Sequence, residues 1–301
     1  MTFPLPLGID HVHCYLLSAS GGGWILVDAG LGLPGAEERW APVLASLDGS
    51  IERVVVTHFH PDHVGDAAAV AELTGASVLQ GRLDHEQCAR VWGDDGSRDR
   101  LEQHMVAHGL PDEQLPALRR DSDALRRYVR VPDDPEPLEP GAHMDGWEIL
   151  HLPGHADGHL GLLLDGVLIA GDALLARISP TVGVYPEARP DPLADYLRSL
   201  ERLAELAPRV AYSGHGEAIR DPALRARELI EHHRQRLEAT RAALADEPRS
   251  AYEVSLRVFG NVLSPTERRF AVAEALAHLE RLVRSERAAR AEDGDRVAYV
   301  R

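Results

Sequence analysis

A dense run of metal-binding side chains separates an apolar segment from a helix-like segment of the chain. Residues of types that bind metal ions fall within six positions, at His58, His60, Asp62 and His63. In an extended loop, His58 and His60 can point to the same side, while Asp62 and His63 turn toward a neighbouring position as the helix begins. This layout suits two adjacent cations better than one. The alternative that it disfavours is a histidine-rich surface loop without metal.

The ligand types limit the identity of the metal. Imidazole and carboxylate groups without a thiolate favour zinc, manganese or iron over copper(I) or an iron–sulfur cluster. We therefore expect two divalent metal ions as cofactors, with zinc as the first choice and manganese or iron as alternatives.

Further candidate ligands each end an apolar run and follow a glycine. They are His155 in Leu-Pro-Gly-His, Asp172 in Ile-Ala-Gly-Asp and His215 in Ser-Gly-His-Gly. Glycine lets the backbone bend sharply after a strand or approach a ligand closely. We interpret Asp28, in Val-Asp-Ala-Gly, as a residue that orients ligands from outside, with a simple turn aspartate as the alternative. For His159, an outer or substrate-facing role competes with that of an ordinary polar histidine.

The ordered set of these motifs resembles the metallo-β-lactamase superfamily, particularly its glyoxalase II-like hydrolases. The resemblance covers roughly residues 5 to 218, apart from an insertion. It implies an α/β fold, the αββα sandwich, with a dinuclear metal site at one edge of the two sheets. The ligands that it implies are His58, His60 and His155 for the first ion, Asp62, His63 and His215 for the second, and Asp172 as a bridge between both.

A dinuclear site of this kind supplies hydrolytic chemistry. Two ions about 3.5–4 Å apart lower the pKa of a bridging water toward neutrality and polarise the oxygen under attack, so no protein nucleophile is required. Asp62 is our candidate for orienting that water or moving a proton. All 32 basic residues are arginines, which excludes Schiff-base mechanisms. We predict an enzyme, a hydrolase that uses hydroxide of the dinuclear site to cleave a small ester, thioester or lactone.

The strand-like and helix-like segments are placed so that each group of candidate ligands follows a predicted strand. Strands are predicted from alternating or β-branched apolar runs and helices from periodicity near 3.6. The predicted strands are 12–17 and 24–28, joined as a hairpin across Ser-Gly-Gly-Gly, and 54–56, 147–152, 160–164, 167–170 and 210–212. The predicted helices are 35–47, 64–74 and 192–206.

Two regions surround this catalytic pattern. Residues 82–140 are charged and helix-periodic in pieces, which predicts an inserted helical segment. Residues 219–301 are almost entirely helix-like and end in short runs around Asp293-Gly294-Asp295 that predict a β-hairpin. We therefore divide the chain into a catalytic domain at 1–218 and a helical C-terminal domain at 219–301, which we call the tail. The latter resembles the winged-helix domain of the β-lactamase-like protein 2 branch, some members of which act on RNA.

The charge distribution limits the partners. The formal net charge is −16, and such a field repels phosphate backbones and anionic membrane surfaces. From residue 219 onward, 16 arginines face 14 acidic residues, so this part is nearly neutral. We expect a small-molecule substrate and no nucleic acid partner. The C-terminal part is expected to pack against the catalytic domain, cover the pocket rim or mediate formation of a homodimer.

Composition also bears on the compartment. Cys14 and Cys88 are too few for a disulfide scaffold and are interpreted as small buried apolar residues. No basic residue precedes Arg39, and no run of about 18 apolar residues occurs. We expect a cytoplasmic protein without a membrane segment.

Other functions fit parts of the sequence. The tail's resemblance suggests an RNA- or phosphodiester-processing metallohydrolase. Because persulfide dioxygenases of this superfamily use one iron, a single-iron enzyme of that kind is a further alternative, which the presence of His63 and His215 disfavours. Substrate choice is expected to lie in the insertion, the loop at 177–192 and the tail.

Several polar residues outside the ligand set are given lesser roles. Tyr185 and Arg189 are pocket candidates by their position after Asp172. His11 and His13 are assigned a structural role on an N-terminal strand. The His232-His233 pair is interpreted as part of a solvated helix face, because it lies in a segment rich in arginine and glutamate.

Overall fold

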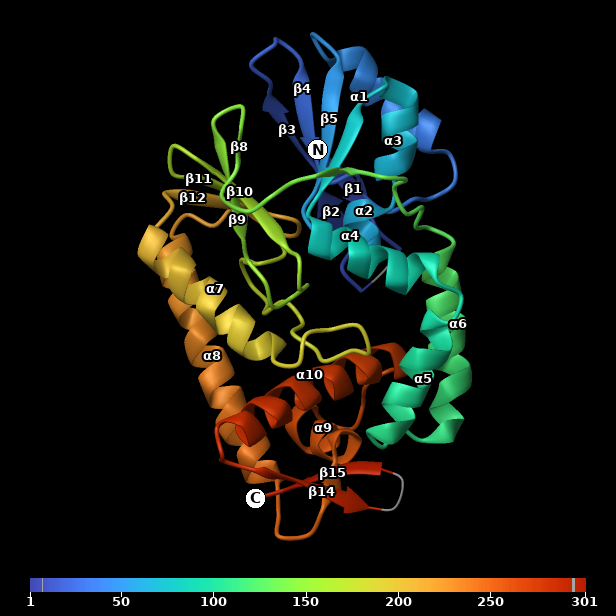
Figure 1. Cartoon of the computed structure of the whole chain (residues 1–301), viewed down its shortest axis with the longest axis vertical. Coiled ribbons are helices and arrows are strands. Elements are labelled where there is room, and N and C mark those ends of the chain that lie inside the picture. The colour runs from blue at the N-terminus through green and yellow to red at the C-terminus, as the bar shows by residue number, and fades with distance from the viewer. Residues whose placement is uncertain (7, 294–295) are drawn as a thin grey trace.

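The protein is an αββα sandwich. A computed structural model describes residues 1–6, 8–293 and 296–301. Two β-sheets pack face to face, and helices cover the outer face of each sheet (Figure 1). This is the fold class predicted from the motif order.

The first sheet comes from the N-terminal half and has the strand order β3-β4-β5-β6-β7. Its strands are β3 (Tyr15–Ser18), β4 (Trp24–Val27), β5 (Ile51–Val56), β6 (Ser77–Gln80) and β7 (Glu136–Pro137). β3 and β4 form the predicted antiparallel hairpin, whereas β4 to β7 run parallel. Val54 and Val56 are fully buried, because α1 (Ala36–Ser46) and α3 (Ala67–Thr74) cover this face with Trp40 and Val70.

The second sheet has the order β12-β11-β10-β9-β8. Its strands are β8 (His143–Met144), β9 (Trp147–His151), β10 (Leu160–Leu164), β11 (Val167–Gly171) and β12 (Val210–Ser213). Asp165 and Gly166 have φ values of 49° and 75°, so they form the predicted two-residue turn between β10 and β11. The outer face is covered by α7 (Pro192–Leu206) and α8 (Pro222–Ala243), which also pack on each other.

The inner faces of the sheets share one apolar cluster. Ile25 and Val55 from the first sheet pack with Ile149, Leu162 and Ile169 from the second. This cluster fixes the position of one sheet relative to the other. The loops that leave the sheet edges are therefore also held in fixed positions.

The helix predicted over 64–74 begins earlier and is interrupted. α2 (Pro61–Val64) starts inside the histidine-rich motif, and α3 begins only at Ala67. The interruption arises where the chain passes close to the loop after β4: the backbone N–H of Asp66 donates to the carbonyl of Gly30. A side chain at Gly65 would overlap the backbone of Gly30 and Gly32. The N-terminal segment also differs, because β2 (His11–His13) is separate from β3 and pairs with β1 (Thr2–Pro4).

The predicted insertion is helical. Its elements are α4 (Arg82–Cys88), the π-helical turn η1 (Ala89–Gly93), α5 (Ser97–Ala107), the 3-10 turn η2 (Asp112–Gln114) and α6 (Leu115–Arg126). After α8, the tail adds β13 (Arg249–Ser250), α9 (Ala251–Phe259), α10 (Pro265–Arg284), β14 (Ala289–Asp293) and β15 (Arg296–Val300). β14 and β15 pair antiparallel as predicted, and the expected Gly294-Asp295 turn lies outside the described residues.

The insertion and the tail share a hydrophobic core. Met105 of α5 and Leu118 of α6 pack with Val254, Leu276 and Tyr299 of the tail, and Figure 1 shows α5 and α6 beside α9 and α10. This packing is the tail's predicted contact with the rest of the chain. The winged-helix assignment and the boundary after residue 218 stay predictions. In the part of the chain that the structure describes, every helix is too short or too polar to span a bilayer.

Candidate metal centre

All seven predicted ligand side chains meet at one edge of the sandwich. The fold achieves this because each ligand lies just beyond a strand end or at the start of a helix. His58 and His60 follow β5, Asp62 and His63 lie in α2, His155 follows β9, Asp172 follows β11 and His215 follows β12. The strand ends therefore assemble residues that are more than 150 positions apart in the chain.

The first group consists of imidazoles alone. One nitrogen from each of His58, His60 and His155 lies within 4.8 Å of the others. His58 Nε2 is 3.0 Å from His60 Nδ1, and the rings of His60 and His155 meet edge to face with centroids 4.4 Å apart. Three neutral imidazoles in this arrangement match the donor set of a divalent transition metal.

The second group contains a carboxylate. Asp62, His63 and His215 likewise offer atoms that lie within 4.8 Å of one another. Asp62 Oδ2 is 3.3 Å from His215 Nε2 and 3.9 Å from His63 Nε2. This group offers a cation one negative charge and two ring nitrogens.

Asp172 lies between the two groups. Its Oδ2 is 3.2 Å from His215 Nε2 and 3.8 Å from His155 Nε2, while its Oδ1 is 3.5 Å from His63 Nε2. A single carboxylate thus faces donors of both groups, which is the position that a bridge between two cations requires.

Unpaired buried atoms provide a test of whether metal ions fit this site. His63 Nε2, His155 Nε2 and Asp172 Oδ1 are buried and have no hydrogen-bond partner among the described residues. A buried polar atom without a partner costs roughly 1–3 kcal/mol. Atoms of this kind pointing into one site fit divalent cations as their missing partners.

The electrostatics of the two groups differ. Burial lowers the pKa of His58 and His155, and that of His60 to about 3, so these rings are neutral and each can offer a lone pair to a metal ion. Burial also opposes charge on His63 and His215, but nearby carboxylates outweigh it, Asp28 and then Asp172 for His63, and Asp172 for His215. They raise the pKa of His63 well above its ordinary range and that of His215 to about 10. Cations bound there would replace these two protons.

Asp28 links the loop after β4 to the histidine-rich motif. Its Oδ2 accepts hydrogen bonds from His63 Nδ1 and Thr57 Oγ1, both at 2.8 Å, and its Oδ1 accepts one from the backbone N–H of Thr57. These bonds leave His63 Nε2 facing the site. These contacts support the orienting role that the sequence suggests for Asp28, which stays a prediction.

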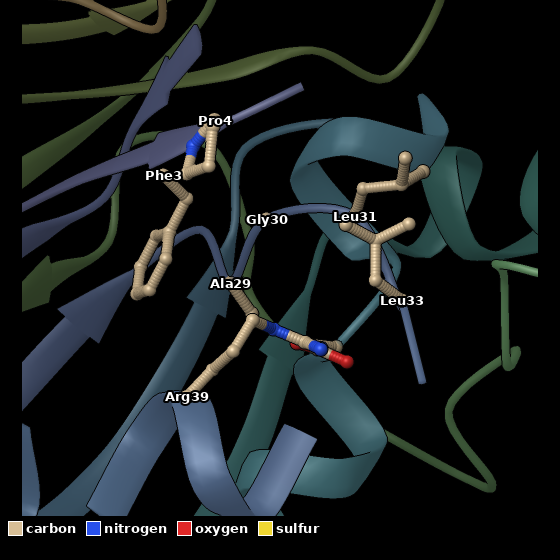
Figure 2. A pocket seen from close by; sticks show the side chains of 8 residues that line it. Phe3, Pro4, Ala29, Gly30, Leu31, Leu33 and Arg39 are labelled. Carbon is tan, nitrogen blue, oxygen red and sulfur yellow. The ribbon is translucent and has the colours of Figure 1, made fainter. Parts of the chain in front are cut away.

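The loop that follows Asp28 accepts a hydrogen bond at Gly30 from the backbone of Asp66, whose buried carboxylate pairs with the partly exposed Arg39. Arg39 of α1 donates to Asp66 at 2.6 Å, and Trp40 donates to the same carboxylate. Figure 2 shows Arg39 extending from α1 toward Ala29 and Gly30, where it lines a cavity of about 30 Å³. That volume suits little more than a water molecule, so this cavity is no substrate pocket.

Replacing Asp28 by asparagine should weaken metal binding. The amide keeps the size of the side chain but presents only one oxygen to the donors of Thr57 and His63. We expect a tenfold to hundredfold loss of affinity for the more weakly held metal ion, measured by competition with a chelator. The exposed Asp48→Asn is the control, and equal affinity in both variants would reduce Asp28 to a turn residue.

The other ligand rings are oriented largely by backbone carbonyls. His155 Nδ1 lies 2.8 Å from the carbonyl of Thr181, and His215 Nδ1 lies 2.7 Å from that of His11. His159 stacks on His58 with centroids 4.7 Å apart and accepts a hydrogen bond from the backbone N–H of Asp172. His159 therefore fixes the turn that presents Asp172.

The structural role predicted for His11 and His13 is confirmed, although their partners, and the role of Asp84, were not predicted. His11 and His13 clamp the loop around His215: His11 Nε2 accepts from the N–H of Gly216, and His13 Nε2 bonds its carbonyl. Buried Asp84 accepts the N–H of Phe59 between two ligand residues. The His11-x-His13 spacing was a sequence signal for the contact with the loop around His215. Nothing near Asp84 in the chain indicates its contact with Phe59.

Glycine is required at the loop that carries His215. A methyl group at Gly214 would overlap the carboxylate of Asp172 and the ring of His63. The Ser-Gly-His-Gly motif therefore reflects close approach of backbone to two candidate ligands.

Other sequence-based assignments lie away from the centre. Tyr185 packs against the cluster shared by the insertion and the tail, and Arg189 pairs with Asp195. The solvated assignment of His233 is wrong: the ring is fully buried and stacks on His278. His278 lies 45 residues after His233, on helix α10, and this helix covers the face of α8 that carries His233. Cys14 and Cys88 are buried, as predicted.

Comparison with known families covers both parts of the chain. The model of the metallo-beta-lactamase superfamily matches residues 7–215, and that of the metallo-beta-lactamase-like C-terminal domain matches residues 237–300. A beta-lactamase-like protein 2 homolog from Drosophila melanogaster is 26% identical over 236 residues, which cover 77% of this chain and 68% of the homolog. The resemblance stated from the motifs is confirmed.

Individual proteins are similar over most of the chain. The probable metallo-hydrolase YqjP of Bacillus subtilis (strain 168) is 28% identical, covering 92% of this chain and 89% of YqjP. A hydroxyacylglutathione hydrolase from Alkalilimnicola ehrlichii is 30% identical, covering 64% of this chain and 60% of that enzyme.

A solved structure extends the comparison to the whole fold. The crystal structure of the metallo-beta-lactamase family protein TTHA1429 from Thermus thermophilus superimposes with a TM-score of 0.85 and 38% identity, covering 100% of this chain and 97% of that one. Fold, motif order and family match agree, and the chain belongs to the metallo-β-lactamase superfamily.

Proposed function

We propose that this protein hydrolyses a small ester, thioester or lactone with the help of two divalent metal ions, zinc in the first place. The observation that carries the proposal is the meeting of seven histidine and aspartate side chains around buried nitrogen and oxygen atoms without partners among the described residues. The names of the similar proteins, a probable metallo-hydrolase and a hydroxyacylglutathione hydrolase, support hydrolysis.

The residues that would hold the metals follow from the two groups. His58, His60 and His155 would hold one ion, Asp62, His63 and His215 the other, and Asp172 would contact both. When bound, such ions acidify water and polarise the carbonyl oxygen of a substrate. Manganese or iron would serve the same donor set.

Asp62 is the residue best placed to move a proton. About 15% of its side chain is exposed, against 8% for Asp172, so it is the more accessible carboxylate to water and substrate. Burial opposes its negative charge, but His63 and His215 hold its pKa below the ordinary value. The carboxylate is therefore ionised at neutral pH and can accept a proton from the attacking water at Oδ.

The charge of the molecule favours a small substrate over a polyanion. A net charge of −16 repels a phosphate backbone at a distance. Binding of a polyanion against this field would depend on local arginines and would weaken steeply as salt is added.

Replacing Asp62 by asparagine tests its role. We expect the rate constant of hydrolysis to fall about a hundredfold, because the amide cannot accept the proton. Metal per chain is measured in the same sample, and Asp48→Asn, at an exposed position, is the control. Full activity with both metals bound would remove Asp62 from the mechanism.

A substrate panel tests the function itself. Purified protein is analysed for metal and assayed on a thioester, a lactone, a β-lactam and a phosphodiester, before and after chelation and with zinc, manganese or iron restored. We expect metal-dependent cleavage of the thioester or lactone with little effect of added salt. Cleavage of the phosphodiester alone, falling steeply with salt, would overturn the proposal.

A further inference from the structure

A second pocket lies between the catalytic sandwich and the tail. It has a volume of about 440 Å³, within the range of small-molecule sites. Its walls are the segment at 177–179, helix α8, the end of α9 and helix α10. In Figure 1, α8 runs beside α7 and continues down to α9 and α10, so it connects the sandwich to the tail.

Arginine side chains dominate the charge of this pocket. Arg236 of α8 is half-buried, and its guanidinium lies 4.4 Å from the ring centroid of Phe259. Its Nη1 has a long contact of 3.5 Å with the carbonyl of Val258. In the described portion of the chain, no carboxylate lies within ion-pair distance of Arg236. A half-buried guanidinium without an acidic partner leaves positive charge available to a ligand.

Arg225 places a second guanidinium in the same pocket and holds its wall. Its side chain is 17% exposed and donates to the carbonyls of Leu175 and Ile178 and to Glu228. Since Glu228 balances this charge in part, Arg236 remains the main unneutralised cation.

Two titratable groups, His232 and Glu274, also line the pocket. Burial lowers the pKa of His232, and the charges of Arg236 and Arg225 lower it further. For Glu274, which lies on α10, burial raises the pKa to about 7. Because Glu274 is only partly ionised near neutrality, it neutralises Arg236 incompletely.

The pocket wall formed by residues 177–179 is held in place by hydrogen bonds before any ligand binds. Ser179 Oγ lies 3.1 Å from Nε2 of the buried His233, whose Nδ1 lies 3.3 Å from His278 Nε2. His278 Nδ1 is in turn 2.8 Å from the carbonyl of Glu274. This chain of side chains ties the segment at 177–179 to α8 and α10, so a ligand would enter a preformed site.

The same segment connects the pocket to the candidate metal centre. Two residues beyond Ser179, the carbonyl of Thr181 is bonded by the ring of His155. At its other end, Arg177 pairs with Glu217, which lies two residues after His215. The segment at 177–181 therefore links one wall of the pocket to a residue that contacts His155 and to a residue near His215.

We propose that this pocket binds an oxyanion, a carboxylate or a phosphate, carried by the substrate at a position remote from the bond that is cleaved. Guanidinium groups match the geometry of both anions and bind them through charge-assisted hydrogen bonds. The inference rests on the proposed hydrolysis, because it assigns the substrate class as an anionic ester, thioester or lactone. The apolar side chains of Leu229 and Phe259 limit the anion to one small group rather than an extended polyanion.

The direct test measures, by calorimetry, the binding of inorganic phosphate and of acetate to the metal-loaded full chain. We expect Arg236→Gln to weaken the site for at least one of these anions at least tenfold, since hydrogen bonds to charged groups are the strong ones. The matched control is Arg234→Gln, which removes an exposed arginine of the same helix that pairs with Glu231. Anion bound at the metal centre is retained in both variants and is counted separately.

A second variant guards against misfolding. Ile178 is 51% exposed at the pocket wall, so Ile178→Asp should fold normally while placing a negative charge beside the arginines. It should weaken anion binding without a change in the melting temperature. Phosphate and acetate binding that is equal in wild type, Arg236→Gln and Ile178→Asp would overturn the proposal.

Kinetics separate this proposal from the proposed function. Thioesters of mercaptocarboxylic acids with spacers of increasing length are compared with thioesters of the corresponding amides. We expect Arg236→Gln to lower kcat/KM roughly tenfold for the best carboxylate and to leave the amides unchanged. An equal effect on both series would refute the pocket. If wild type cleaves neither these compounds nor any compound of the substrate panel but anion binding depends on Arg236, the proposed hydrolysis is refuted and the anion site stands.

Discussion

Asp172→Ala is expected to lower the rate constant of hydrolysis by roughly a thousandfold, the largest effect among single substitutions at the centre. Its two carboxylate oxygens lie 3.2 to 3.8 Å from ring nitrogens of His63, His155 and His215. Without it, neither ion would have its shared anionic ligand. Bound metal per chain should fall together with the rate, as measured by elemental analysis.

The control for this substitution is another buried aspartate. Asp195→Ala removes a carboxylate that is 5% exposed and pairs with Arg198 and Arg189 on α7 and its approach. This variant is expected to lose some stability but to keep its metal. If Asp172→Ala retained two ions and near-normal activity, the bridging role would be wrong.

Leu276→Ala is expected to lower the free energy of unfolding by about 2–5 kcal/mol. Leu276 is 1% exposed and lies in the cluster that joins α10 to α5, α6 and α9. Deleting its isobutyl group leaves a cavity in a core that serves the insertion and the tail together. Chemical denaturation of the metal-loaded protein measures the loss.

The matched control is Leu224→Ala on α8. Its side chain is 49% exposed, so the free energy of unfolding should change by no more than about 0.5 kcal/mol. A Leu276→Ala protein as stable as this control would show that the tail and the insertion do not stabilise each other. Activity of the folded fraction should be unchanged, because Leu276 is not among the residues of the centre.

Much of the candidate centre follows from local patterns. His58, His60, Asp62 and His63 are recognisable by type and spacing, and glycines mark the turns before His155, Asp172 and His215. The strand-to-helix context follows from apolar periodicity, which is why α7 spans the predicted residues 192–206. These features depend on interactions within a few residues, so the chain displays them directly.

The residues that support the centre are harder to find. Thr181 and His11 orient ligand rings through their backbone carbonyls, and every residue type supplies a carbonyl. Asp84 acts on a loop 25 residues away. Contacts of this kind leave no mark in residue type or spacing.

The burial of His233 shows the same limit. A histidine within a charged helix indicates a solvated face, yet α10 covers this one. Whether His233 is buried depends on packing between two helices that are far apart in the chain, and no periodicity of the sequence indicates that packing.

The sequence by itself determined the fold class, the set of candidate ligands and the chemistry they suit, because metal-binding side chains and strand patterns are local and specific. Only the tertiary structure decided that the insertion and the tail share one core, that His233 is buried, and that Arg236 faces a pocket without a carboxylate partner among the described residues. The physical reason is that burial and charge neutralisation depend on which distant surfaces meet, and those meetings arise from the packing of the whole chain.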